Sequence, residues 1–345
     1  MKALVKKGEG FHNVGLVELD EPIVKASEIK VKIHAAGICG TDLHIIADEY
    51  PANYPVTMGH EYSGIVVEVG ADVTDFKIGD RVVSLTAAKS CGKCNYCYEG
   101  LVMLCEERKS IGSGVNGAFS EYMVIPAHLA FRIPENVTMD EAALCEPLAC
   151  MVRCVVERGS VLAGDFVLVS GPGAIGLLTM QVAIASGGNV IVIGTSVDRE
   201  RLQLAKDLGA YDTIIIDEEH VEERVNQITK GKGFDVAFEC AGIESSSRNC
   251  LKLLKKTGLY VQVGLYGKEI KFNLDMALTK EIKISNGFAS ERTSWIRALN
   301  LLEQNKVNVL PLISTKLPLE KWEEAFEMVR SKSAFKVLLE PNPSK

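Results

Sequence analysis

The sequence predicts a mixed α/β protein in which a mainly β domain is followed by a domain built on a parallel sheet. Short alternating apolar stretches, separated by Gly, Pro and Asp, fill the chain to about residue 145. From about residue 150, apolar strands alternate with helix-period segments, a pattern typical of a parallel sheet covered on both faces. The length of 345 residues also favours two domains over one.

The first domain is expected to span residues 1–149. Its strand-like stretches alternate apolar and polar residues between turn signals: EIKVKIHAAGIC, EYSGIVVEVG, DRVVSL and AFSEYMVIP. No helix-period run interrupts them before the 140s. We therefore expect this domain to be mainly β.

The second domain is expected at residues 150–287. Its strand stretches are DFVLVS, NVIVIG, DTIIID, FDVAFECAG and GLYVQVGLYG, with helical stretches such as VDRERLQLAKDLGA between them. Residues 288–345 do not extend this pattern, because a helical stretch, SWIRALNLLEQNK, leads to a final apolar strand, FKVLLEP. We expect this last segment to return to the first domain.

Composition and charge narrow the classes of function. Hydrophobic residues make up 47% of the chain and charged residues 24%, which is ordinary for a globular protein. The net charge of -7 argues against a nucleic acid partner. The opening MKALVKKGEG lacks an apolar signal segment, and no stretch reaches the roughly 18 apolar residues of a membrane-spanning helix. We expect a cytoplasmic protein without a nucleic acid or membrane partner.

Four of the ten cysteines form the run C-x2-C-x2-C-x7-C. Four thiolates can surround Zn²⁺ tetrahedrally at about 2.3 Å, and Gly92 and Gly100 offer the tight bends of a short lobe. In a cytoplasmic chain such clustering favours a metal over disulfides. The predicted ligands of a structural zinc, in a lobe at about residues 88–107, are Cys91, Cys94, Cys97 and Cys105. An iron–sulfur cluster and unliganded thiols are the alternatives.

A glycine-rich turn, GPGAIG, follows the strand stretch DFVLVS and opens an apolar helical stretch. In that context the glycines permit a tight turn and a close approach to pyrophosphate, and the helix N-terminus offers N–H groups to the phosphates. The predicted dinucleotide-binding residues of this loop are Gly171, Gly173, Ala174, Ile175 and Gly176. A glycine turn without a ligand is the alternative.

The end of the next strand bears on the choice between NAD and NADP. An acidic residue about 20 positions after the glycine loop would bind the ribose 2′-hydroxyl of NAD, but Ser196 stands there. Arg199 and Arg201 lie nearby and would suit a 2′-phosphate. Because Asp198 could still reach a ribose, the sequence favours NADP only slightly.

A second group of residues mixes metal-ligand types. Cys39, Thr41 and His44 follow the stretch EIKVKIHAAGI, and the pair His60-Glu61 opens the stretch EYSGIVV. A thiolate, an imidazole and a carboxylate are typical of zinc sites that keep an exchangeable position. Taken alone, each fragment is weak evidence, because a lone cysteine usually lies in the core and a lone His-Glu pair usually lies at the surface or in a cap.

The motifs together resemble the zinc-containing medium-chain dehydrogenases of the alcohol dehydrogenase superfamily. They occur in that family's order: Cys39 with Thr41 and His44, GHE at 59–61, the four-cysteine lobe, EPL at 146–148 and the glycine loop. The resemblance covers nearly the whole chain and is nearest to the polyol, sorbitol-like and threonine dehydrogenase branch. It implies a GroES-like, mainly β catalytic domain and a Rossmann doubly wound dinucleotide-binding domain.

The resemblance also implies roles for individual residues. Those matched to the catalytic zinc are Cys39, His60, Glu61 and Glu146, the last as a ligand of the metal or of its water. Thr41 and His44 match the groups that relay the alcohol proton to solvent. The lobe cysteines match the structural zinc ligands, so two zinc ions per chain are expected, with a homo-oligomer, a tetramer or a dimer, as the assembly.

The chain departs from the liver-type alcohol dehydrogenase pattern, in which a second cysteine completes the site. Cys145 precedes Glu146 by one residue, so a cysteine ligand stays open, although the EPL match favours Glu146. Cys150 and Cys154 are expected in the core. Because a second bound carboxylate would make the site net negative, we expect Glu146 to position water or to ligate transiently, and Glu61 to exchange with water or with Glu146.

The expected activity is zinc-dependent hydride transfer between a secondary hydroxyl of a small polyol, diol or sugar alcohol and NAD(P). Zinc at an open site is a Lewis acid that favours loss of the hydroxyl proton. L-Threonine 3-dehydrogenase is the alternative, and a phosphorylated substrate is open if basic residues such as Arg292 contact it. A non-catalytic NAD(P)-binding zinc redox sensor and a zinc-free quinone-type reductase are the rival interpretations.

Overall fold

The protein, seen in a computed structural model that describes residues 1–343, divides into two compact units. The first comprises Met1–Glu146, Ser290–Glu303 and the chain from Val309 onward. The second comprises Pro147–Ala289 and Gln304–Asn308. Most of the chain after residue 290 therefore lies in the first unit, whereas the short stretch Gln304–Asn308 belongs to the second.

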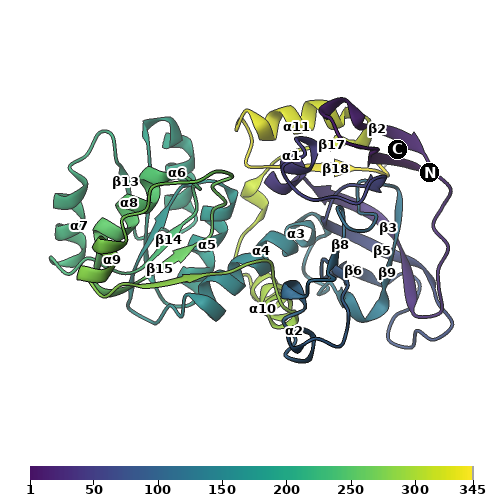
Figure 1. Cartoon of the computed structure of the whole chain (residues 1–345), viewed down its shortest axis with the longest axis horizontal. Coiled ribbons are helices and arrows are strands. Elements are labelled where there is room, and N and C mark those ends of the chain that lie inside the picture. Colours follow the sequence, from purple (N-terminus) through teal and green to yellow (C-terminus); the bar gives the residue numbers. More distant parts are fainter. Residues whose placement is uncertain (344–345) are drawn as a thin grey trace. The chain divides into compact units, whose positions relative to one another are not determined.

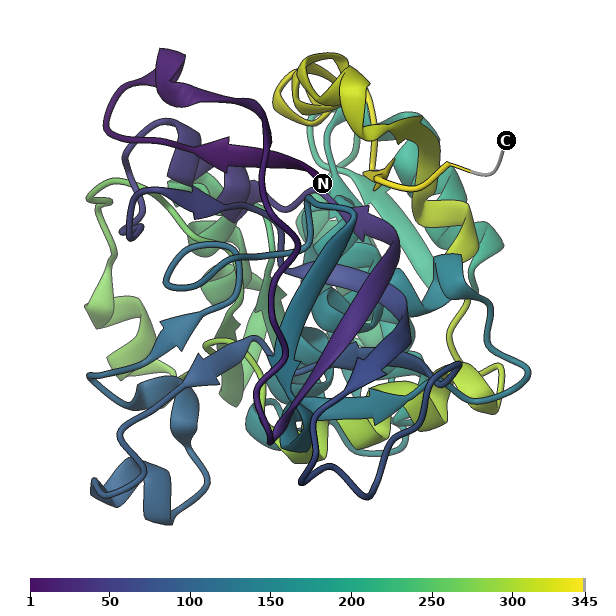
Figure 2. The ribbon, with the colours of Figure 1, turned by 90° about the vertical axis from the view of Figure 1, so that its right-hand side faces the viewer.

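The first unit is built around a seven-stranded sheet (Figure 2). Its strands follow the order β10 (Ala130–Arg132), β6 (Arg81–Ser84), β5 (Glu61–Val69), β3 (Glu28–Gly37), β18 (Lys336–Glu340) and β17 (Ile313–Pro318), and β9 (Tyr122–Pro126) also pairs with β3. The smaller sheets join β2 (Val14–Glu18), β1 (Lys2–Lys6) and β4 (Val56–Thr57), and pair β7 (Ala87–Lys89) with β8 (Lys109–Ser110).

The alternation that predicts β3 reflects which of its faces is buried. Ile29, Val31 and Ile33 are fully buried in the core of this unit, whereas Lys32 is exposed. Strand β18 pairs antiparallel with β3 and adds Leu339 to the same core. The last strand of the chain therefore completes the sheet that the N-terminal strands begin.

Short helices connect the strands of the first unit. They are α1 (Gly40–Ile46), α2 (Asn95–Tyr98), α3 (Met139–Ala143), α10 (Arg292–Glu303) and α11 (Trp322–Arg330), with 3-10 turns at Phe11–Asn13, Val102–Leu104, Ala127–Leu129, Leu310–Leu312 and Leu319–Lys321. Helix α1 was not expected, because it has no long apolar period to reveal it. It is capped locally instead, since the Cys39 N–H donates to the Asp42 carboxylate at 2.9 Å.

The second unit is a parallel sheet with helices packed around it (Figure 1). Its six strands follow the order β13 (Asp212–Ile215), β12 (Asn189–Gly194), β11 (Phe166–Ser170), β14 (Phe234–Glu239), β15 (Leu254–Gln262) and β16 (Lys283–Asn286). The helical segments are α4 (Cys145–Val152), which starts at the end of the first unit, a π-helix (Arg153–Arg158), α5 (Ala174–Ala185), a 3-10 turn (Ser196–Asp198), α6 (Arg199–Asp207), α7 (Val221–Thr229), α8 (Glu244–Leu253) and α9 (Leu274–Thr279).

The strand order reverses between β11 and β14, which is where doubly wound sheets bind ligands. The predicted fold class, a mainly β domain with a doubly wound parallel-sheet domain, is confirmed. None of the helices formed by residues 1–343 combines the length and the apolar character that crossing a membrane requires.

Candidate active site

Three candidate metal ligands come together where two strands of the first unit meet. Cys39 lies just after β3, and His60 and Glu61 lie at the start of β5. The two strands are antiparallel with Gly37 opposite Glu61, so the end of one lies beside the start of the other. The metal-binding atoms of Cys39, His60 and Glu61 all lie within 4.8 Å of one another, a spacing that suits ligands bonded to one zinc at about 2.0–2.3 Å.

The Glu61 carboxylate fills a space that a glycine leaves open. A Cβ atom at Gly37 would lie only 2.4 Å from Glu61 Oε2. The local backbone register and the absence of a side chain at Gly37 together set where this carboxylate lies.

Lys336, on β18, binds the same carboxylate. Its Nζ donates to the two oxygens of Glu61, at 2.5 and 2.7 Å, and to the Ile38 carbonyl at 3.3 Å. Both side chains are buried. Burial lowers the pKa of Lys336, but the Glu61 charge, followed by that of Cys39, outweighs burial and raises this pKa above its ordinary value. The ammonium therefore stays charged and offsets one negative charge in the group.

Sequence reasoning missed Lys336, which lies 275 residues from Glu61 along the chain. The available signal was a lysine within the apolar final strand FKVLLEP, because a buried lysine usually needs a charged partner.

The Asp42 carboxylate lies beside the His60 ring. Its Oδ1 is 3.6 Å from His60 Nδ1, and among the described residues this buried oxygen has no hydrogen-bond partner. Burial lowers the pKa of His60, but Asp42 and Cys39 outweigh burial and raise this pKa well above its ordinary value. A carboxylate beside one ring nitrogen fixes a metal-binding imidazole with its other nitrogen toward the ion. The donor set therefore fits zinc.

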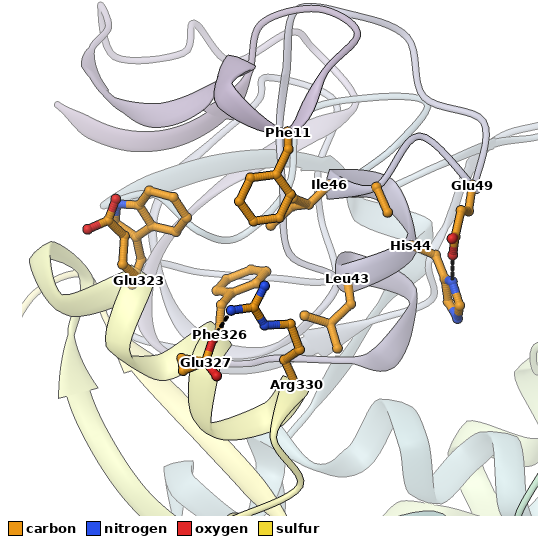
Figure 3. A pocket seen from close by; sticks show the side chains of 11 residues that line it. Phe11, Leu43, His44, Ile46, Glu49, Glu323, Phe326, Glu327 and Arg330 are labelled. Atoms are coloured by element: carbon orange, nitrogen blue, oxygen red, sulfur yellow. Dashed lines mark hydrogen bonds and ion pairs between the residues drawn. The ribbon is translucent and has the colours of Figure 1, made fainter.

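Thr41 and His44 lie on α1, the helix that follows Cys39. The Cys39 thiol donates to Thr41 Oγ1 at 3.7 Å, and His44 Nδ1 lies 2.6 Å from Glu49 Oε2. Figure 3 shows His44 turned toward Glu49 at the border of a pocket of about 510 Å³, lined largely by apolar side chains of α1 and α11. His44 is about one third exposed, so it can exchange protons with water.

Glu146 occupies the first turn of α4 and is buried. Among the described residues, the close ligand group is Cys39, His60 and Glu61 without it, although its charge acts on Lys336. Cys145 is fully buried, and burial raises its pKa, which keeps the thiol protonated and does not favour it as a ligand. Two further cysteines of this region differ in exposure, Cys154 being buried and Cys150 half-buried.

The four lobe cysteines also converge. The sulfur atoms of Cys91, Cys94, Cys97 and Cys105 lie within 4.8 Å of one another. Cys91 Sγ is 3.9 Å from Cys97 Sγ, and the Cys91 N–H donates to Cys105 Sγ at 3.4 Å. Gly92 and Gly100 have φ angles of +69° and +79°, so they make the tight bends expected of them. Four thiols in this arrangement fit a closed tetrahedral zinc site.

The glycine loop joins β11 to α5 in the conformation that its residues require. Gly171 has a φ of +107°, and a Cβ atom at Gly176 would lie 1.9 Å from the Gly171 carbonyl oxygen. Only glycine fits at these two positions. Gly173 is the N-cap of α5, and Ala174 and Ile175 lie in its first turn. The free N–H groups of the helix N-terminus therefore lie at the carboxyl edge of the sheet.

Ser196 lies just after β12 and bonds to a residue that sequence reasoning missed. Its N–H and its hydroxyl donate to the two carboxylate oxygens of Asp217, at 2.8 and 2.6 Å. Asp198, considered above as a ribose ligand, instead accepts from the Thr195 N–H and hydroxyl at 3.0 and 2.9 Å. No local motif reveals Asp217, because it reaches Ser196 from the turn after the following strand, 21 residues on.

The two arginines predicted to bind dinucleotide lie in different surroundings. Arg199 forms an ion pair with Glu218. Arg201 lies next to the glycine loop, with its Nη1 3.8 Å from where a Cβ atom of Gly173 would be. Arg201 is therefore near the expected pyrophosphate, whereas Arg199 is held at the edge of the sheet.

Known proteins match the chain along nearly its full length. An alcohol dehydrogenase GroES-like domain matches residues 25–135, and a zinc-binding dehydrogenase domain matches residues 174–304. A sorbitol dehydrogenase of Halalkalibacterium halodurans is 40% identical over 342 residues, covering 99% of both proteins. A D-arabitol-phosphate dehydrogenase of Enterococcus avium is 35% identical, covering 99% of this chain and 98% of that protein.

A solved structure has the same fold throughout. The crystal structure of a zinc-binding dehydrogenase of Sinorhizobium meliloti, bound to NADP, superimposes with a TM-score of 0.89 at 32% identity and covers 99% of both chains. With two matching domains and relatives of this identity over the whole length, the chain belongs to the zinc-containing medium-chain dehydrogenases, of the alcohol dehydrogenase type.

Proposed function

We propose that this enzyme transfers hydride between a secondary hydroxyl of a small polyol, diol or sugar alcohol and NAD or NADP. The observation that carries the proposal is the convergence of a thiol, an imidazole and a carboxylate within 4.8 Å, although Cys39 and His60 are 21 residues apart. Relatives named as sorbitol and D-arabitol-phosphate dehydrogenases support a polyol as the class of substrate.

Cys39, His60 and Glu61 would hold the catalytic zinc, with Glu146 positioning water or ligating transiently. Zinc bound there supplies Lewis-acid activation of the substrate hydroxyl. Thr41 would accept the hydroxyl proton as it gives up its own, and His44 would pass that proton to solvent, with Glu49 orienting the imidazole ring. Since Thr41 and His44 are three residues apart on one helix, they share a face.

Glu61 has two competing partners in this proposal, the metal and Lys336. The Lys336 ammonium would pair with the Glu61 carboxylate whenever that carboxylate is not bound to zinc, so the buried charge would not be left unpaired. The Lys336 contact supports the expectation that Glu61 alternates with water or Glu146. The four lobe cysteines hold a second, structural zinc, for two zinc ions per chain.

The substrate is tested with a panel of sorbitol, 2,3-butanediol, L-threonine and sugar-alcohol phosphates, each with both dinucleotides. A polyol or diol should give the highest kcat/KM. L-Threonine as the best substrate would instead establish L-threonine 3-dehydrogenase, and no turnover of any alcohol by a protein that binds dinucleotide would favour the redox sensor.

A phosphorylated substrate gains no support from Arg292. Its guanidinium lies 4.8 Å from the centre of the Phe131 ring and donates to the His128 carbonyl at 2.8 Å. Both contacts stabilise the first unit, so the unphosphorylated polyol is the primary candidate.

The cofactor preference, the location and the assembly complete the proposal. Ser196, Arg199 and Arg201 carry the sequence's slight preference for NADP. Cytoplasmic location and a homo-oligomer, a tetramer or a dimer, rest on the sequence and on the family resemblance. Light scattering on the purified zinc-loaded chain measures the assembly directly.

A further inference from the structure

We infer that Asp217 makes NAD the preferred dinucleotide by occupying the donors that a 2′-phosphate of NADP would use. The inference rests on the proposed dinucleotide site and deepens it by naming the cofactor and a residue that selects it. It reverses the slight preference for NADP drawn from Ser196, Arg199 and Arg201.

The turn after β13 brings Asp217 to the end of β12. These two strands are parallel and pair up to Gly194 opposite Ile215. The next residue, Ile216, donates its N–H to the Gly194 carbonyl at 2.9 Å. The chain then bends, because the Glu218 N–H donates back to the Ile215 carbonyl at 3.1 Å. Asp217 is therefore held beside the first residues that follow β12, at the carboxyl edge of the sheet.

The Asp217 carboxylate accepts two hydrogen bonds from Ser196. Each carboxylate oxygen accepts one hydrogen bond, from the N–H at 2.8 Å and from the hydroxyl at 2.6 Å. The hydroxyl bond, with a contribution from the backbone N–H and from Arg199, lowers the pKa of Asp217 below its ordinary value. The carboxylate is thus ionised at neutral pH and occupies both donors of Ser196.

The arginines do not leave an unmatched positive charge at this position. Arg199 is paired with Glu218, the neighbour of Asp217 in the same turn. Arg201 lies against Gly173 of the glycine loop, where a pyrophosphate would use it. Asp217 and Glu218 therefore bind Ser196 and Arg199, two of the three residues from which the sequence infers a 2′-phosphate site.

The chemistry of the two ribose groups separates NAD from NADP here. The 2′-hydroxyl of NAD can donate a hydrogen bond to the Asp217 carboxylate. The 2′-phosphate of NADP instead carries about two negative charges, which the carboxylate repels. The phosphate would meet a carboxylate at hydrogen-bond range and would have to displace it from Ser196. Charge and occupied donors both disfavour NADP.

Dissociation constants for NADH and NADPH, measured by nucleotide fluorescence on the zinc-loaded full chain, test the inference. The wild type should bind NADH more tightly. Asp217→Ala should lower the ratio of the NADPH dissociation constant to the NADH dissociation constant by about tenfold or more. A change of this size is typical of the loss of hydrogen bonds to a charged group. Asp217→Asn, which keeps the shape and removes the charge, should shift the ratio in the same direction. Asp207→Asn, at the opposite end of α6, removes a matched charge and should leave the ratio unchanged.

Calorimetry with adenosine 2′,5′-bisphosphate and 5′-AMP isolates the 2′-phosphate from the rest of the cofactor. Asp217→Ala should tighten binding of the bisphosphate relative to AMP. Equal or tighter binding of NADPH by the wild type, or a ratio that neither Asp217 variant changes, overturns the inference and leaves the dehydrogenase proposal intact. Failure of the wild type to bind either dinucleotide would instead refute the proposed function itself.

Discussion

Glu61 illustrates how single residues of this site serve two partners. Its carboxylate belongs to the group of candidate zinc ligands, yet it also accepts two hydrogen bonds from Lys336. The space for it is left by Gly37. A buried carboxylate that has a resident ammonium can leave and rejoin a metal without being left unpaired.

Replacing Lys336 by Met should destabilise the zinc-free protein by about 3–5 kcal/mol, because it leaves the Glu61 charge buried without a partner. Zinc can take over that role, so the zinc-loaded variant should recover much of the loss. Urea unfolding with and without zinc measures both. Lys336→Arg, which keeps the charge, is the control and should lose less. Equal stability of zinc-free wild type and Lys336→Met would show that the pair does not hold Glu61.

Removing either the thiol or the imidazole should abolish turnover through loss of one metal ion. Cys39→Ser and His60→Ala should each bind one zinc fewer per chain, as measured by atomic emission, while their NADH dissociation constants stay within about threefold of the wild type. Cys150→Ala changes a half-buried cysteine outside the group and should retain metal and activity. Retained turnover in Cys39→Ser or His60→Ala would refute the assigned zinc site.

Among the elements, α1 concentrates the chemistry in seven residues. It carries Thr41, Asp42 and His44, and its cap ties it to Cys39. In the proposed mechanism, this one helix therefore supplies the proton acceptor, the carboxylate beside His60 and the relay imidazole. The lobe of four cysteines is a separate element, whose closed ligand set suits a structural role.

Cys97→Ser tests the role of the lobe. A hydroxyl is a poor zinc ligand, so we expect one zinc ion per chain instead of two, faster proteolysis within residues 91–105 and a lower melting temperature, with the catalytic zinc retained. Zinc content, limited digestion and thermal unfolding measure these effects. Visible absorption typical of an iron–sulfur cluster in the wild type would contradict zinc as the lobe metal.

The 3-10 turn that holds His128 should make the first unit sensitive to acid. The His128 side chain is exposed, but partial desolvation, followed by the charge of Arg292, still lowers its pKa below the ordinary value of 6.5. The unfolded chain then binds this proton more tightly, so stability is lost as the pH falls below about 6.5. His128→Gln should show a smaller drop in melting temperature between about pH 7.5 and about pH 5.5. His220→Gln changes another exposed histidine, which lies in the second unit, and should keep the drop of the wild type. An unchanged drop in His128→Gln would contradict the assignment.

For the whole molecule, the two chemical functions belong to different units of the chain. All candidate zinc ligands lie within Met1–Glu146, and the glycine loop and Ser196 lie within Pro147–Ala289. Metal and dinucleotide binding are therefore expected to be separable properties of the protein.

Treatment with a zinc chelator should remove the two metal ions in separate phases. The site with an open position should lose zinc first, together with turnover, and the closed lobe should lose it later, with a fall in stability. NADH binding should survive the first phase, and added zinc should restore turnover. Simultaneous loss of both ions, with activity following the total zinc content, would contradict separate catalytic and structural sites.

The parts predicted well are those whose signal is local. Strands such as β3 and β14 show their period within a few residues, and the glycine loop shows its turn conformation by its position between a strand and an apolar helix. Helix α1 was not predicted, because its local signal is a cap and not an apolar period. The contacts of Lys336 and Asp217 were not predicted, because strand pairing brings each residue to its partner. Lys336 lies 275 residues from Glu61 along the chain, and Asp217 lies 21 residues from Ser196.

By itself, the sequence determined the two kinds of domain, the four-cysteine lobe, the glycine loop and the order of motifs that marks the family, because spacing and period are properties of a linear chain. The tertiary structure decided which charges face one another. It put Lys336 against Glu61, Asp42 behind His60 and Asp217 on Ser196, and so altered both the charge of the metal site and the expected cofactor. Charge interactions fall off with distance in space, and no count along the chain supplies that distance.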